Sequence, residues 1–251
     1  MDIRKILKKS WKIFRGRKKL LVLAVILGLA SALDTFTGTF RGGDMIIRLS
    51  FCTLLIFFVV IILLSEISII RITTNENRNL SIGKLLRSSA MYFWRMYGLS
   101  LLAGLPAIVV AFSLEGYQQG ISTIGLECLI PVLLIFLPLT FVVMIVINLA
   151  QAKVFFEDEK AIESFRQTWN LANKNQRAFL KLGLVLIGGG FVFSNSFIFG
   201  WNFLASNYSG QTRTILAVIL WVLYFLLTAI ISGYSRVSWT VAYVTLSRKK
   251  R

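Results

Sequence analysis

Six long runs of apolar residues limit this 251-residue sequence to very few folds. A helix needs about 20 mostly apolar residues to cross the hydrocarbon core of a bilayer. Because no water satisfies backbone polar groups there, such runs must form helices or closed barrels. Barrel strands alternate apolar and polar residues, whereas these runs are continuously apolar. We therefore expect an all-α integral membrane protein with six transmembrane helices. The expected spans are residues 20–40, 49–65, 96–114, 128–152, 182–205 and 214–235.

Lysine and arginine are distributed unevenly along the chain. If each predicted span reverses the side of the membrane, 25 of the 28 basic residues lie on one side, leaving only Arg41, Arg48 and Arg213 on the other. Short cytoplasmic loops carry an excess of basic residues, which predicts that both termini and the two long loops are cytoplasmic. The first apolar run is too long for a cleaved signal peptide. We expect a multi-pass protein of the plasma (cytoplasmic) membrane of a prokaryote.

A short basic segment containing tryptophan recurs before two of the apolar runs. Residues 6–13 and 164–171 agree position by position in residue type, and both have a hydroxyl residue followed by tryptophan. A weaker third copy, residues 84–89, aligns on Ser88 with a register that could shift by one. Self-similarity at a regular spacing indicates a repeat architecture. We therefore predict a single domain, 1–251, built as a threefold repeat with units of about 1–75, 76–155 and 156–251.

The three segments carry apolar residues at helical spacing, with basic and amide residues on the remaining faces. Helices of this kind lie in the membrane interface with the apolar face towards lipid. We expect three cytoplasmic amphipathic helices, with Ile6 and Phe14 in the first and Phe165 in the third directed towards lipid. Trp201 and Trp239 are also expected to be interfacial anchors, because indoles favour that region. The predicted interfacial and lipid-facing residues are Trp11, Lys8, Lys12, Arg15, Trp94, Arg87, Trp169, Arg166 and Arg177.

A few polar residues fall within or near the predicted spans. An ionisable residue in a span is costly and favours a functional hypothesis, but Glu66 is close enough to Arg71 for a local ion pair. Amides in spans usually hydrogen-bond between helices. Glycines 188–190 favour close helix packing, and a helix broken around a substrate is the alternative. The intramembrane polar candidates are Glu66, Asn148, Gln151 and Asn195.

Catalytic and metal-binding patterns are missing from the sequence. It has no histidine, which removes Ser-His and Cys-His nucleophiles and the HExxH zinc motif. It also lacks the GxSxG and P-loop motifs. The acidic residues 157–159 precede the third basic segment, where a helix dipole favours acids, and we prefer this interpretation to a metal site. We expect no enzyme activity, no cofactor and no metal.

Residues 154–158, with the sequence Val-Phe-Phe-Glu-Asp, followed by Ser-Phe-Arg-Gln-Thr-Trp-Asn-Leu at 164–171, resemble a known membrane module. It is the multi-pass membrane domain found beside some glycerophosphodiester phosphodiesterases, and related stand-alone membrane proteins share it. The N-terminal copy agrees through Ser10, Trp11, Ile13 and Gly16. In the later copy Thr168 replaces the serine and Lys174 stands where glycine would be. The resemblance implies a membrane module without the phosphodiesterase barrel.

Three functions remain open at this stage. The first is a non-enzymatic membrane protein that organises or binds anionic lipid, or is a membrane accessory to a partner protein. The second is a transporter or permease subunit, which requires a polar cavity at the centre of the bilayer. The third, an intramembrane enzyme, would require converging acids. A net charge of +17 is explained by topology and by attraction to anionic headgroups, and we expect no nucleic-acid partner.

Overall fold

The computed structural model describes residues 2–37, 45–74, 80–118 and 126–247, and all elements in this part of the chain are helical. A 3-10 turn, Ala90–Tyr92, joins α4 to α5, and a π-helical segment, Leu184–Gly188, joins α8 to α9. The helices are α1 (Ile3–Arg15), α2 (Lys18–Thr37), α3 (Met45–Thr73), α4 (Ile82–Ser89), α5 (Phe93–Gln118), α6 (Leu126–Glu157), α7 (Ala161–Lys174), α8 (Gln176–Gly183), α9 (Gly189–Asn207) and α10 (Gly210–Ser247).

Four of these helical stretches are long and apolar enough to cross a membrane. They are Ile56–Thr73, Ile130–Glu157, Gln176–Asn207 and Gly210–Ser247. The other two predicted spans coincide with α2 and α5, where the side chains of residues 31–37 and 110–118 lie outside the described part of the structure. The side chains of Arg41 and Arg48, predicted to lie on the far side of the membrane, also lie outside it.

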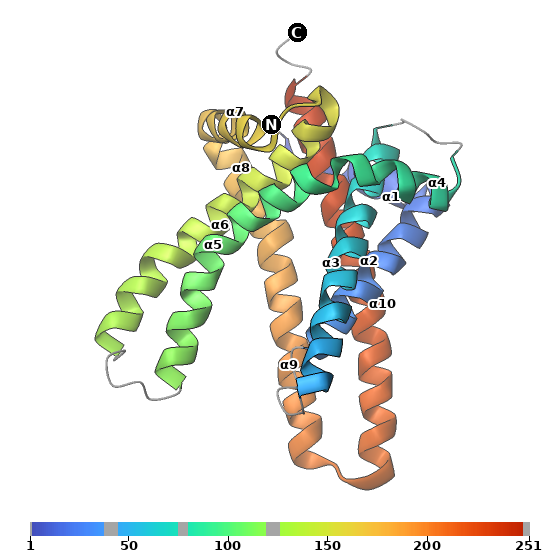
Figure 1. The fold of residues 1–251 in the computed structure, drawn as a ribbon, viewed down its shortest axis with the longest axis vertical. Helices are drawn as coiled ribbons and strands as arrows, with labels where there is room; N and C mark the ends of the chain where they lie inside the picture. Colours follow the sequence, from blue (N-terminus) through green and yellow to red (C-terminus); the bar gives the residue numbers. More distant parts are fainter. Residues whose placement is uncertain (1, 38–44, 75–79, 119–125, 248–251) are drawn as a thin grey trace. The chain divides into compact units, whose positions relative to one another are not determined.

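The helices form two compact units, residues 1–93 with 184–251, and residues 94–183. In the first unit α2, α3 and α10 pack side by side, and α9 packs on α10 (Figure 1). The two short helices of this unit lie at the end of the bundle where α10 finishes, α1 against α10 and α2, and α4 against α3. In the second unit α7 and α8 pack on α6.

Small residues allow α2 and α10 to approach closely. A Cβ at Gly28 would lie 2.6 Å from the Cα of Ala229, and one at Gly233 would lie 2.5 Å from the Cβ of Ala24. Small residues at helix contacts are a common basis of packing between membrane helices. In the second unit Gly183 has the same role against Ile145 of α6.

Several helices extend beyond the predicted spans, and the extension of α10 changes the predicted position of Trp239. The 38 residues of α10 correspond to about 57 Å of helix, against about 30 Å for the hydrocarbon core. The predicted last span ends at residue 235, but α10 continues to Ser247, and Arg236–Tyr243 are all buried. Trp239 is only 1% exposed. It is therefore a core residue, and the prediction of an interfacial anchor there is wrong.

The glycines at 188–190 do not have the predicted role. A Cβ at any of the three would meet no described atom within 4 Å, so they do not permit close packing there. The helix is also not broken, because α8 continues through the π-helical segment into α9. A π-helical turn widens a helix locally without ending it. Where a break in the helix was the alternative prediction, the helix instead changes from α-helical to π-helical and back.

Candidate functional site

Helix α1 separates a buried face from a basic exposed face. Asp2 begins the helix by accepting a hydrogen bond from the Lys5 N–H at 3.3 Å, as expected of an N-cap. Ile6, Ser10 and Phe14 are buried, so Ile6 and Phe14 contact protein rather than lipid, and that part of the prediction is wrong. Their spacing of four places them on one face of the helix. The exposed residues are Arg4, Lys5, Lys8, Lys9, Trp11, Lys12 and Arg15.

Tyr234 of α10 holds α1 in place. Its hydroxyl donates to the carbonyl of Leu7 at 3.2 Å. Its ring lies edge-on to Trp11, with centroids 5.7 Å apart, and close to Phe14 at 6.4 Å. These contacts join residues more than 200 positions apart in the sequence, and they direct the basic face of α1 away from the bundle.

The same division of faces recurs in α4. Leu85 and Ser89 are buried, whereas Arg87 is exposed. The Ser89 hydroxyl lies 3.0 Å from the hydroxyl of Ser68 in α3. The register of the weak repeat copy therefore shifts by one, since Ser89 rather than Ser88 is the buried hydroxyl. Trp94, at the start of α5, is 75% exposed.

Helix α7 packs on α6 and buries two hydroxyl residues. Ser164 and Thr168 are fully buried, and Trp169 is exposed, with its ring centroid 6.0 Å from that of Phe165. Arg166 and, in α8, Arg177 are also exposed. The three tryptophans predicted to face lipid, Trp11, Trp94 and Trp169, are all exposed. The cations predicted to accompany them are exposed as well.

Three other basic residues of the first unit form hydrogen bonds within the protein instead of projecting a free charge into its surroundings. The Arg17 guanidinium donates to the carbonyl of Ile72, and the Lys19 ammonium donates to that of Leu80 at 2.9 Å. Arg71 donates to the hydroxyl of Ser88 at 2.5 Å. Arg17 and Lys19 therefore fix the start of α2 to the segment that leaves α3.

A buried ion pair joins α3 to α10. Arg236 donates to the carboxylate of Glu66, and their side chains are only 10% and 16% exposed. The partner seen for Glu66 is thus Arg236, 170 positions away, whereas the sequence had suggested a local pair with Arg71. Sequence reasoning treated Arg236 as a charge beyond the last span, and the continuation of α10 places it inside the bundle instead. A charged pair in such a site needs each partner, because an isolated buried charge is strongly unfavourable.

The candidate amides do not all behave as predicted. Asn148 and Asn195 each donate a hydrogen bond to a carbonyl of their own helix, at Met144 and Phe191, whereas the prediction was of bonds between helices. Gln151 is buried, at 3% exposure.

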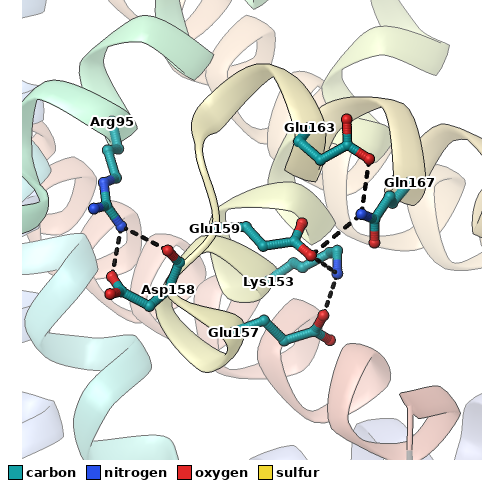
Figure 2. Close-up of polar contacts among 7 residues, drawn as sticks. All are labelled: Arg95, Lys153, Glu157, Asp158, Glu159, Glu163 and Gln167. Atoms are coloured by element: carbon teal, nitrogen blue, oxygen red, sulfur yellow. Dashed lines mark hydrogen bonds and ion pairs between the residues drawn. The ribbon is translucent and has the colours of Figure 1, made fainter.

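The turn between α6 and α7 is an ion-paired cluster (Figure 2). Lys153, whose side chain is 6% exposed, pairs with Glu157 and lies 3.3 Å from Glu159. Asp158 has a positive φ of 51°, a backbone conformation that non-glycine residues adopt at some cost. Its carboxylate accepts a bond from Arg95 at 2.5 Å, and its carbonyl accepts from the same nitrogen at 3.0 Å.

Gln167 completes this cluster from α7. Its amide donates to Glu163 at 2.8 Å and to Glu159 at 3.2 Å. The acids of the turn are thus bound by cations and an amide. Among the residues that the structure describes, no three His, Cys, Asp or Glu side chains are grouped to hold a metal ion. The cluster orders the turn from which α7 begins.

Lys153→Met is expected to lower the free energy of unfolding by about 1–2 kcal/mol, because it removes the cation between Glu157 and Glu159. The measurement is thermal unfolding of the purified protein in detergent. Lys174→Met is the matched control, since Lys174 is an exposed cation of α7 and should change stability little. Equal stability of the two variants would contradict the role of Lys153.

Comparison with known proteins identifies the family of this chain but no individual relative. No curated protein and no solved structure matches the chain. The family described as "Domain of unknown function (DUF7847)" matches residues 1–246. This match extends from before α1 to the last turn of α10 and so includes both units. The chain therefore belongs to the family DUF7847.

Proposed function

We propose that this protein is a non-enzymatic, six-span membrane protein that binds anionic lipid headgroups through α1, α4 and α7. In this proposal both termini face the cytoplasm of a prokaryotic cell, and the three short helices lie at the cytoplasmic surface of its plasma membrane. The lipids would be organised around the protein, or the basic surface would help it to associate with a membrane partner.

The exposed face of α1 carries this proposal. Lys8, Lys9, Lys12 and Arg15 are exposed, and none has an acidic partner in the part of the chain that the structure describes. Trp11 is exposed beside them. Basic residues near an anionic membrane surface contribute about 1 kcal/mol each to binding. An indole among them favours the interface, where one side of the ring is apolar and the other is hydrated.

The packing of the short helices supports the proposed repeat. Helix α4 packs on α3 and α7 packs on α6, in each case the long helix that precedes it in the chain. Helix α1 packs on α10. In the proposed repeat each basic helix accompanies a long helix, and repeats in the same orientation would present their basic helices to the same leaflet.

We place the transporter second and the intramembrane enzyme third. A solute path would use polar groups that face a cavity, whereas Asn148 and Asn195 are bonded within their own helices. The acids at the α6–α7 turn are engaged by Lys153, Arg95 and Gln167. The proposed kinship with the membrane domain beside glycerophosphodiester phosphodiesterases fits an accessory role.

The experiment replaces four exposed cations of α1 and leaves Arg17 and Lys19 unchanged, because these two bind backbone carbonyls and their loss would disturb the fold. Lys8→Gln, Lys9→Gln, Lys12→Gln and Arg15→Gln are combined in one variant. We expect retention of phosphatidylglycerol, measured by native mass spectrometry of the purified protein, to fall at least tenfold.

The matched control keeps the charges and exchanges their type, as Lys8→Arg, Lys9→Arg, Lys12→Arg and Arg15→Lys. Its lipid retention should equal that of the unmodified protein. Retention that is the same in all three proteins would refute lipid binding by α1, provided that thermal unfolding shows that the glutamine variant is folded.

A further inference from the structure

A groove lies where α9 and α10 meet, at the end of the first unit opposite α1 (Figure 1). Its volume is about 590 Å³. Seven of its eight lining residues belong to the first four turns of α10, and Trp201 of α9 forms the other wall. The lining residues are Trp201, Gly210, Arg213, Thr214, Ala217, Val218, Trp221 and Val222.

One end of the groove is cationic, and the rest of it is lined mainly by apolar residues. Thr214, Val218 and Val222 are four residues apart, as are Arg213, Ala217 and Trp221, so two adjacent rows of one helix form its floor. From Arg213 to Val222 the helix rises about 14 Å, close to the depth of one leaflet of the hydrocarbon core, about 15 Å. Val218 and Val222 remain more than half exposed.

Aromatic contacts make the walls of the groove rigid. Trp201 and Trp221 meet edge to face with centroids 6.5 Å apart, and Phe197 lies 5.5 Å from Trp221 in a similar arrangement. Phe197 also stacks on Tyr224 at 3.9 Å. Edge-to-face and offset-stacked rings stabilise each other beyond the area that they bury. These contacts support Trp201 and Trp221, the two aromatic residues that line the groove.

Arg213 lies at the other end of the first unit from most of its basic residues. It is exposed, and in the described part of the chain it has no hydrogen bond or ion pair. The other cations of this unit whose side chains the structure describes lie on or near α1, the start of α2, the end of α3, α4 and the last third of α10, at the opposite end. The preference for cytoplasmic basic residues therefore does not account for Arg213.

We propose that this groove binds one anionic phospholipid, with its phosphate on Arg213 and Thr214 and an acyl chain along Val218, Trp221 and Val222. A guanidinium matches phosphate oxygens in charge and geometry, and the threonine hydroxyl supplies a second donor. The exposed aliphatic rows match an acyl chain in length and polarity. A neighbouring helix would cover the apolar rows but would leave the cation unmatched. The proposed lipid site is argued from the geometry of the groove alone. The proposed topology adds only that this end of the protein lies in the outer leaflet of the membrane.

The test uses the full-length protein in phosphatidylcholine vesicles that contain phosphatidylglycerol with a diazirine in its acyl chain. After illumination, mass spectrometry maps the lipid adducts. We expect adducts on Val218 and Val222 in excess over those on Ile215 and Leu226, which are exposed residues of α10 outside the groove. A uniform distribution along α10, or no adducts in the groove, would overturn the proposal.

Two variants test the cation. Arg213→Gln should reduce the excess of groove adducts about fivefold, the ratio expected from one basic residue near an anionic lipid. Arg213→Lys should keep most of it. Arg87→Gln, at the other end of the unit, is the matched control and should leave it unchanged. An undiminished excess in Arg213→Gln, or an equal yield with diazirine-labelled phosphatidylcholine, would refute an anionic ligand here. Neither outcome depends on lipid binding by α1, so the two proposals fail separately.

Discussion

Glu66→Gln is expected to destabilise the folded protein by about 3–5 kcal/mol, because it removes the carboxylate that pairs with Arg236 inside the bundle. The two side chains are 16% and 10% exposed, so water compensates little. Since the pair joins α3 to α10, its loss weakens the contact between the second and last long helices of the first unit. The measurement is the thermal unfolding midpoint in detergent.

A double-mutant cycle separates the pair from the individual side chains. Arg236→Gln should be destabilising in the same way, because it leaves Glu66 as the unmatched charge. The double variant Glu66→Gln, Arg236→Gln should be more stable than either single variant, since two amides can bond to each other without an isolated charge. Arg87→Gln, an exposed cation of α4, is the control. Additive losses in the double variant would show that the two residues do not interact.

Gly28→Ala is expected to have the second largest effect, a loss of about 1–3 kcal/mol of stability from overpacking. The added methyl group would lie 2.6 Å from both the Cα and the Cβ of Ala229 and 2.8 Å from its backbone nitrogen. Backbone atoms cannot turn aside as a flexible side chain can, so α2 and α10 must separate. Such a separation also loosens the platform on which α1 lies, since α1 packs on both of these helices.

Gly190→Ala is the matched control for this substitution. It is the same chemical change in a helix of the same unit, at a position where the new Cβ would meet no described atom within 4 Å. Alanine is favoured over glycine in a helix by up to about 1 kcal/mol, so no loss is expected. If both variants were equally stable, the close approach of α2 and α10 would not limit the packing. Thermal unfolding of the two purified proteins makes the comparison.

These contacts connect stability to the proposed function. The basic face of α1 is useful only if α1 is held in a fixed orientation, and Tyr234, Phe14 and Gly233 provide this at its contact with α10. A loosened α1 would still carry its charges. We therefore expect variants in the bundle to change stability more than lipid retention, and variants on the exposed face of α1 to do the reverse.

The apolar runs were sufficient to predict the helices but not their ends. Hydropathy falls where charged residues begin, so the prediction stopped the last span at residue 235, whereas α10 continues to Ser247. A helix continues past the apolar region when other helices cover it, and this cover depends on residues far away in the sequence. The same limit explains Trp239, which was predicted at an interface and is buried.

The exposure of basic residues follows from local sequence more readily than the pairing of buried ones. Lys8, Lys12, Arg15 and Trp11 are exposed, and a basic residue with no acid nearby in the chain is usually solvated. Buried polar residues were harder to assign, since their partners come from other helices. Glu66 was noticed, but Arg236, its partner 170 positions away, was not.

The sequence alone determined that the described chain is helical, that long apolar helices alternate with short basic ones, and where the basic residues gather. These properties are local, since they follow from residue type and from spacing along one helix. Tertiary structure alone decided that α1 packs on α10, that Glu66 pairs with Arg236, and that Gly28 and Gly233 rather than glycines 188–190 permit close contact. It also placed Arg213 beside two tryptophans at the mouth of a groove. Each of these depends on which faces of two distant helices meet, because burial and pairing are properties of the contact and not of either sequence by itself.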